Sequence, residues 1–100
     1  MALTINRSLV GTQEITLRLE GRLDTSTAPQ LEKEIQDLEG ITCLRLDFEK
    51  LDYLSSAGLR VLLMAQKTMN RCGEMILSHV NETILEVFEV TGFIDILTIE

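Results

Sequence analysis

The feature that most constrains the fold is a change of hydrophobic period, from two to a helical period and back to two, within the first half of the chain. Residues 14–20 alternate strictly between apolar and polar side chains, and residues 41–48 return to this alternation. Period two is typical of a strand with one buried and one exposed face. Between these segments, Leu31, Ile35 and Leu38 recur at the spacing of one helix face. A strand, a helix and a second strand in this order predict an α/β fold.

The rest of the chain continues this plan. We expect further elements at residues 3–10 (strand, joined to the next by a turn at Gly11-Thr12), 55–71 (helix), 74–80 (strand), 81–92 (helix) and 93–99 (strand or short helix). The first helix should begin with a capping box between Thr27 and Gln30, and end at Gly40. We therefore predict one α/β domain over residues 1–100, with a mixed β-sheet in the order β-β-α-β-α-β-α-(β/α). Right-handed crossovers should place its helices mainly on one face.

Composition and charge exclude several classes of function. The chain has nine basic and sixteen acidic residues, a net charge of −7, which repels nucleic-acid phosphates. Its longest apolar run, Val61 to Ala65, is too short to span a membrane, and residues 1–7 lack the charged region and the long apolar region expected of a signal peptide. Cys43 and Cys72 match no metal-binding or redox spacing and are expected to be buried free thiols. We expect a cytoplasmic protein that binds neither nucleic acid nor membrane.

Few residues offer catalytic chemistry. The only histidine, His79, lies among apolar residues of an expected inner strand, where a hydrogen-bonded structural role is the simpler interpretation. Asp24, Asp47 and Asp52 lie in or after expected strands, but nothing in the sequence fixes the distances between them. The common nucleophile, metal and phosphate-loop motifs are missing from the sequence. We therefore expect no enzymatic activity, no metal and no cofactor.

Two serines, Ser55 and Ser56, stand where an apolar strand leads into the second long helix. The structural interpretation is helix capping, because serine accepts a hydrogen bond from a backbone N–H that the helix leaves unpaired. The functional interpretation is a phosphate acceptor, because a helix N-terminus stabilises a group carrying about −1.5 to −2 charges. Taken alone, the pattern favours the capping role.

Three stretches of the sequence resemble one protein family. Residues 21–28 contain Gly-Arg-Leu-Asp followed by Thr-Ala, residues 46–63 contain Ser-Ser-Ala-Gly at a helix start, and residues 88–93 read Phe-Glu-Val-Thr-Gly-Phe. In this order they resemble the motifs of bacterial anti-sigma factor antagonists, which are single-domain members of the sulfate transporter and anti-sigma antagonist (STAS) family. The resemblance covers essentially the whole chain and implies a STAS domain over residues 1–100.

The resemblance also implies roles for individual residues. The phosphorylated serine of the family falls on Ser56, with Ser55 as a second, weaker candidate. Gly58 matches the motif glycine, and Asp24 matches the acid of the first stretch. Two positions depart from the family, because Ser55 replaces the motif aspartate and Ala57 replaces a second serine or threonine. These departures bear on how readily a kinase would modify Ser56.

The implied mechanism is partner switching. The unphosphorylated antagonist binds an anti-sigma factor that is also a GHKL-type serine kinase, and this frees a sigma factor. Phosphorylation ends the binding, and a serine phosphatase restores it, so the antagonist is a monomeric ligand and substrate without its own cofactor. The partner surface implied here comprises Asp24, Ser55, Ser56, Ala57, Gly58, Arg60 and Met64.

Two other functions remain open at this point. The same fold could serve as a structural or regulatory subunit of a larger signalling or transport assembly, without a phosphoswitch. An enzyme would need Asp24 and Asp47 to face a common cleft as a carboxylate pair. The position of the two serines and the environments of these two aspartates therefore decide between the alternatives.

Overall fold

The protein is described here from a computed structural model, which covers residues 3–36 and 38–100. Its elements follow the predicted order: β1 (Leu3–Val10), β2 (Glu14–Leu23), α1 (Ala28–Gln36), β3 (Cys43–Leu54), α2 (Ser56–Met69), β4 (Glu74–Ser78), α3 (Glu82–Thr91), the 3₁₀-helix η1 (Phe93–Asp95) and β5 (Thr98–Ile99). The predicted α/β fold is confirmed.

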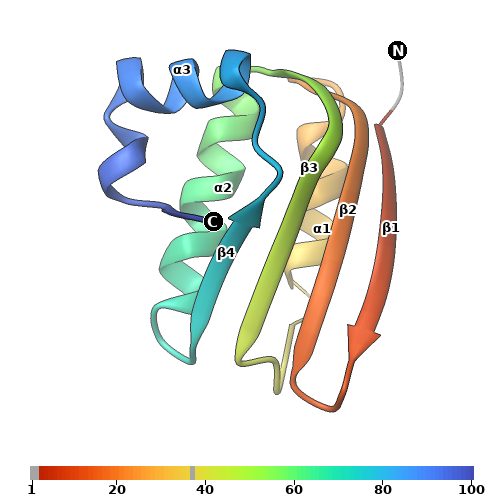
Figure 1. The fold of residues 1–100 in the computed structure, drawn as a ribbon. Helices are drawn as coiled ribbons and strands as arrows, with labels where there is room; N and C mark the ends of the chain where they lie inside the picture. The colour runs from red at the N-terminus through yellow and green to blue at the C-terminus, as the bar shows by residue number, and fades with distance from the viewer. Residues whose placement is uncertain (1–2, 37) are drawn as a thin grey trace.

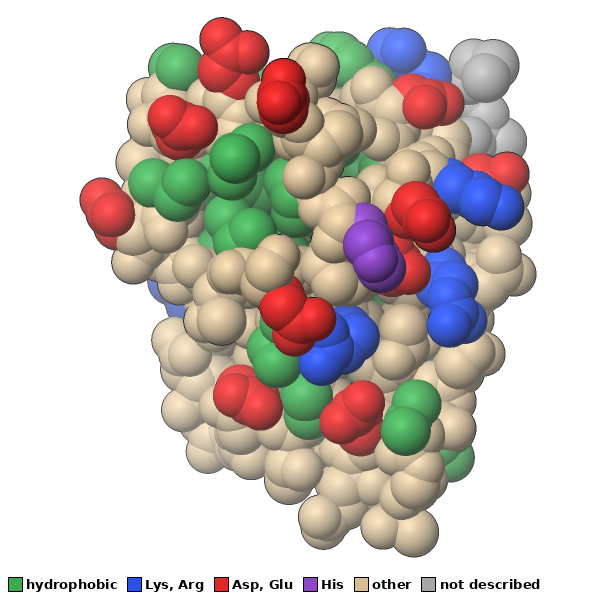
Figure 2. Space-filling view, in the orientation of Figure 1, with side chains coloured by type: hydrophobic (Ala, Val, Ile, Leu, Met, Phe, Trp, Pro, Cys, Tyr) green, Lys and Arg blue, Asp and Glu red, His purple; other side chains and the backbone are tan. Residues whose placement is uncertain are grey.

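The strands form one mixed sheet in the order β1-β2-β3-β4-β5. β1 and β2 are an antiparallel hairpin, while β2, β3, β4 and β5 pair in parallel. Helices α1 and α2 lie side by side against one face of the sheet, and α3 lies beyond the carboxyl end of β4 (Figure 1). The opposite face of the sheet carries charged side chains (Figure 2). One face is therefore packed and the other faces water, as the alternating sequence predicts.

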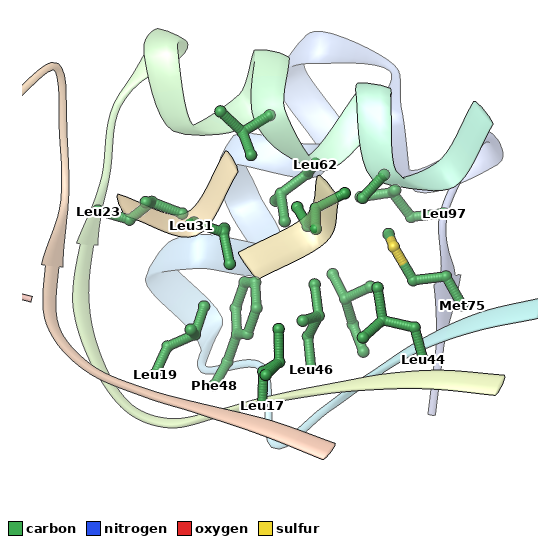
Figure 3. Packing of buried hydrophobic residues seen from close by; sticks show 14 of the residues in the cluster. Leu17, Leu19, Leu23, Leu31, Leu44, Leu46, Phe48, Leu62, Met75 and Leu97 are labelled. Atoms are coloured by element: carbon green, nitrogen blue, oxygen red, sulfur yellow. The ribbon is translucent and has the colours of Figure 1, made fainter. Parts of the chain in front are cut away.

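The core lies between the sheet and the helices (Figure 3). The apolar positions of the alternating segments supply the sheet side of this core, and each is at most 1% exposed: Ile15, Leu17, Leu19, Leu44, Leu46 and Phe48. Phe88 of α3 is also fully buried, with its ring centroid 6.4 Å from that of Phe48. Burial of each such side chain stabilises the fold by roughly 1.5–3 kcal/mol. Phe88 therefore fastens α3 to the core.

The strand β3 is longer than predicted, because it continues beyond Phe48 to Leu54. Its pairing with β2 shifts register twice, and each shift leaves an additional residue on β3. The bulges turn the period-two burial of the first half into a period of three, with Phe48, Leu51 and Leu54 buried. Residues 49–54 therefore form strand where we expected a loop, and they bring β3 level with the end of β2.

The limits of helix α1 also differ from the prediction. The helix ends at Gln36 and does not reach Gly40. Gly40, with a φ of +82°, lies instead in a turn that is closed by a hydrogen bond of 3.0 Å from the Ile41 N–H to the Leu38 carbonyl. The capping box is wrong as well, because the Gln30 side-chain amide donates to the carbonyl of Leu3 at 2.7 Å. Gln30 thus ties the helix to the edge strand β1 instead of closing its own first turn.

The cysteines are free, but neither is fully buried as the sequence predicts. Cys43 is half-buried, and this burial, with the nearby Glu14 carboxylate, raises the pKa of its thiol. Cys72 is exposed after α2, so the prediction of two buried thiols is wrong for this residue. No helix among the described residues is both long and apolar enough to cross a membrane.

Candidate functional site

The site forms where the parallel strands β2 and β3 end next to each other. Leu23 pairs with Leu54, and the backbone N–H of Ser55 donates to the carbonyl of Leu23 at 2.9 Å. Asp24 and Ser55, which follow these strands, therefore lie at the same edge of the sheet. The structure thus places the first two motif stretches at the same end of the sheet.

The two serines have different environments. Ser55 is the N-cap of α2, half-buried, and its hydroxyl oxygen accepts a hydrogen bond from the Gly58 N–H at 3.3 Å. Ser56 is the first helical residue and is exposed. Its hydroxyl makes no hydrogen bond to any other residue that the structure describes. Ser55 thus performs the capping role, and Ser56 leaves a hydroxyl free at the positive end of a helix.

Gly58 is required by the close approach of α2 to the strand ends. A Cβ atom at this position would lie 2.7 Å from Leu54 Cδ1, 2.8 Å from Leu23 Cγ and 3.1 Å from the Leu23 carbonyl oxygen. Gly58 is itself buried, so it contributes to the site through shape and not through direct contact with a partner. The neighbouring Ala57 is half-buried against the core.

Asp24 organises the turn between β2 and α1. Its Oδ1 atom accepts hydrogen bonds from the Ser26 hydroxyl at 2.8 Å, from the Ser26 N–H at 3.0 Å and from the Thr27 N–H at 3.2 Å. The bond from the Ser26 hydroxyl is the largest of the causes that lower the pKa of Asp24, against a smaller opposing effect of desolvation. This carboxylate is therefore ionised at neutral pH and holds a turn next to the exposed Ser56 end of α2.

Arg22 and Tyr53 complete this end of the molecule, and the sequence analysis missed them. The Arg22 guanidinium carbon lies 4.1 Å from the centroid of the Tyr53 ring, and its Nε is 3.6 Å from Asp24 Oδ2. The two residues are register partners only because β3 bulges between Leu51 and Tyr53. Tyr53 remains 41% exposed, so an aromatic ring and a guanidinium are available at the surface near the site.

The outer side of α2 continues the surface away from Ser56. Arg60 and Met64 follow it at successive four-residue steps and are exposed, with Met64 at 41%. The predicted inner side of the helix is buried: Leu59, Val61, Leu62, Ala65 and Met69. A groove between α1 and α2 runs past Met64 and is lined by Glu32, Ile35, Gln36, Val61 and Thr68. Ser56, Arg60 and Met64 therefore share one accessible helix face.

His79 and Asp47 belong to a separate cluster. His79 follows β4, with a φ of +57° and an exposed ring, so its expected place inside a strand is wrong. Its Nδ1 is 3.0 Å from Asp47 Oδ1, while Arg18 Nε lies 3.7 Å from Asp47 Oδ2. Ligand atoms of Asp47, Glu49 and His79 lie within 4.8 Å of one another. Because His79 and Arg18 already engage both oxygens of Asp47, this cluster is explained by the hydrogen bond to His79 and the ion pair with Arg18.

The two aspartates do not form an acid–base pair. Desolvation tends to raise the pKa of Asp47, but hydrogen bonds from the Glu49 N–H and His79, together with the charges of His79 and Arg18, lower it overall. The pKa of Asp24 is lowered too, by contacts with a different set of residues. Carboxyl pairs that act as acid and base have pKa values pushed apart, with one raised. Asp24 and Asp47 therefore each serve their own set of hydrogen bonds and ion pairs, and the exposed surface around Ser56 is the stronger candidate for a functional site.

Comparison with known proteins agrees with this picture. A family model described as the STAS domain matches residues 6–100. The chain belongs to the STAS family. The protein BtrV of Bordetella bronchiseptica is 39% identical over 84 residues, which cover 81% of this chain and 72% of BtrV. The anti-sigma-B factor antagonist of Listeria monocytogenes is 33% identical over 93 residues, covering 89% of this chain and 81% of that protein.

Solved structures of STAS proteins share the fold. The anti-sigma factor antagonist SpoIIAA in its unphosphorylated form has a TM-score of 0.78 at 21% identity, covering 97% of this chain and 87% of that chain. The Bacillus cell fate determinant SpoIIAA in its phosphorylated form has a TM-score of 0.77 at 22% identity, covering 97% and 91%. This STAS chain therefore has the same arrangement of strands and helices as a protein solved in both states.

Proposed function

We propose that this STAS protein is an anti-sigma factor antagonist whose binding is switched off by phosphorylation of Ser56. The observation that carries the proposal is the exposed, unbonded hydroxyl of Ser56 at the first position of α2, next to a Ser55 that already caps the helix. The relatives named as anti-sigma-B factor antagonists support the partner class. SpoIIAA, solved with and without phosphate, supports a reversible modification on this fold.

The helix end can accept the modification without a change of fold. A phosphate on Ser56 would lie at the N-terminus of a 14-residue helix, where unpaired N–H groups and the helix dipole favour negative charge. Arg60 follows four residues later on the same face. The phosphorylated protein should therefore remain folded, and its free energy of unfolding should change little.

Phosphorylation of Ser56 should instead lower the affinity of the protein for its partner. Ser56, Arg60 and Met64 share an exposed face, with the ends of β2 and β3 beside them. A group with about two negative charges on such a surface must lose water on binding, and it repels any acidic partner group. We propose that the partner is an anti-sigma factor with GHKL-type serine kinase activity, and that a separate serine phosphatase reverses the reaction.

The two departures from the family motif, at Ser55 and Ala57, are compatible with the proposal. Ser55 stands where the motif has aspartate, but its N-cap hydrogen bond to the Gly58 N–H is one that an aspartate could equally accept. Ala57 is packed against the core, so a hydroxyl there is not needed for the fold. In this scheme the chain is a monomeric cytoplasmic substrate and ligand, without catalytic activity or cofactor of its own.

Phosphate mapping tests the acceptor directly. The protein and its Ser55→Ala and Ser56→Ala variants would be incubated with ATP and each GHKL-type serine kinase of the source organism, and the products analysed by mass spectrometry. We expect phosphate on Ser56 in the unaltered and Ser55→Ala proteins and none in Ser56→Ala. Phosphate on Ser55, or a Ser56→Ala protein that is still modified, would refute the assignment. Unmodified protein in every reaction would favour a structural STAS subunit instead.

A further inference from the structure

The charge of this protein is distributed unevenly along the chain. Six acidic residues and no Lys or Arg follow Arg71, whereas all nine basic residues, with ten acidic ones, lie at or before it. Nearly all of the net charge of −7 therefore belongs to the last 29 residues. This part of the chain forms β4, α3, η1 and β5, and α3 lies on the far side of α2 from α1 (Figure 1).

Helix α3 carries much of this charge as a stripe. Glu82, Glu86 and Glu89 follow one another at four-residue and three-residue steps and are all exposed, and we call these three residues the acidic stripe. Like charges at this spacing destabilise a helix, and Glu89 also lies near the negative C-terminal end of the dipole. None of the three forms an ion pair within the described part of the chain. Only Glu82, in the first turn of α3, is favourably placed for the helix dipole, so Glu86 and Glu89 bring the free helix no such benefit.

An exposed apolar face runs alongside the acidic stripe. We define this apolar face by Thr83, Val87, Val90 and Thr91, which line a shallow hollow on the outside of α3 together with Glu86. It adjoins the buried side of the helix, where Ile84 and Phe88 pack, and Val87 is half-buried at the boundary between the two. Val90 is 84% exposed, the largest value among the exposed large hydrophobic residues of the described chain.

The apolar character extends beyond the helix. Ile94 and Ile96, in the segment that follows α3, are 37% and 48% exposed. Figure 2 shows hydrophobic side chains gathered on the side of the molecule where α3 and the C-terminal segment lie, with acidic side chains around them. Apolar surface edged by charge is typical of a protein interaction site.

We infer that the outside of α3 is a docking surface for a partner protein that presents a basic amphipathic helix. The apolar face would receive apolar side chains of that helix, since residues at this spacing form the ridges and grooves of helix packing. The acidic stripe would pair with Lys or Arg at its edge, which removes the repulsion among the three glutamates. The charge also argues against other occupants, because an anionic membrane or a second copy of this chain would bring like charges together.

This surface differs in one important way from the Ser56 face. Phosphorylation adds negative charge, which weakens an interface with acidic partner groups but does not repel a basic helix. Binding at α3 should therefore be independent of the Ser56 switch. The chain would then hold a second partner whether or not the first is released.

The test uses a defined probe on the intact protein. The probe is a synthetic helix-forming peptide of about four turns, with Leu on one face and Lys on the other, and its matched control has Glu in place of Lys. Titrations into ¹⁵N-labelled protein would be followed by amide chemical shifts. We expect the Lys peptide to shift signals of residues 82–96 and the Glu peptide to shift none.

Variants separate this surface from unspecific attraction. Val90→Ser should weaken Lys-peptide binding about tenfold, while Leu9→Ser, which removes a 64%-exposed side chain of β1, should change it less than twofold. Ser56→Asp should also leave it within about twofold. Equal binding of the Glu peptide, equal weakening by Leu9→Ser, or loss of binding in Ser56→Asp would overturn the inference. Self-association of the chain that Val90→Ser removes would assign the surface to a second copy instead.

Discussion

The N-termini of α1 and α2 lie at the same edge of the sheet, after neighbouring parallel strands, yet they use their hydroxyl groups differently. At α1, the Ser26 hydroxyl donates to Asp24 at 2.8 Å and the buried Thr27 hydroxyl donates to the Arg22 carbonyl at 2.8 Å. At α2, Ser55 provides the cap and Ser56 is left free. The comparison teaches that a helix start alone does not identify an acceptor. Our proposal rests on the additional feature of α2, a free hydroxyl next to a cap that is already satisfied.

Gly58→Ala should have the largest effect, because it disturbs the packing that positions the α2 end. The new methyl group would overlap Leu54 and Leu23, and the helix would have to move away from the strand ends. We expect a loss of about 2 kcal/mol in the free energy of unfolding, after a partial gain in helix propensity. Urea denaturation would measure it. A loss below about 0.5 kcal/mol would show that α2 is not held by this contact.

The Thr27 hydroxyl, which braces the turn before α1, and the Ser55 cap of α2 should differ in strength in a way that sharpens the comparison. Thr27 is buried, and its hydroxyl oxygen also accepts from the Asp24 N–H at 2.8 Å, whereas the Ser55 bond to Gly58 is longer, at 3.3 Å. Thr27→Val should therefore cost about 1.5 kcal/mol and Ser55→Ala about 0.7 kcal/mol. Thermal unfolding of both variants would check the order. The opposite order would mean that the α2 cap is the stronger of the two.

The α1 turn should also respond to pH through Asp24. Because the Ser26 hydroxyl and the backbone N–H groups favour the ionised carboxylate, its pKa lies below the ordinary value of 3.8. The stabilisation is present above that value and is lost as the pH falls through the lowered pKa of the folded state. Carbon-13 NMR titration of the carboxyl group should show the low pKa, and Ser26→Ala should raise it. An Asp24 pKa unaffected by Ser26→Ala would contradict this hydrogen-bond account.

Ser56→Ala should have the smallest effect on folding. The hydroxyl is exposed and makes no hydrogen bond to other described residues, so its removal should change the free energy of unfolding by less than about 0.5 kcal/mol. The same denaturation experiment as for Ser55→Ala provides the matched comparison. A loss as large as that of Ser55→Ala would show that Ser56, too, has a structural role.

Much of this arrangement could be predicted from the sequence, since the order of elements and the exposure of Ser56 follow from local periodicity and capping. The missed features depend on contacts distant in sequence. Two bulges interrupt the alternating pattern of β3, so its continuation beyond Phe48 was not predicted, and they also bring Tyr53 beside Arg22. Neither bulge is marked by a pattern in the nearby sequence. His79 was misplaced because β4 ends at Ser78, two residues before the predicted end, and the left-handed backbone of His79 turns its ring toward Asp47. Gln30 fits a capping motif but finds a better acceptor on β1.

The most direct test of the account is calorimetric titration of the partner anti-sigma factor with Ser56→Ala, Ser56→Asp and Thr12→Asp. Thr12→Asp adds the same charge at the exposed β1–β2 turn, at the other end of the sheet, and should bind like the unaltered protein. We expect Ser56→Ala to bind equally well and Ser56→Asp to bind about a hundredfold more weakly, with an unchanged melting temperature. Equal affinities of the Ser56→Ala and Ser56→Asp proteins would contradict a switch at this hydroxyl.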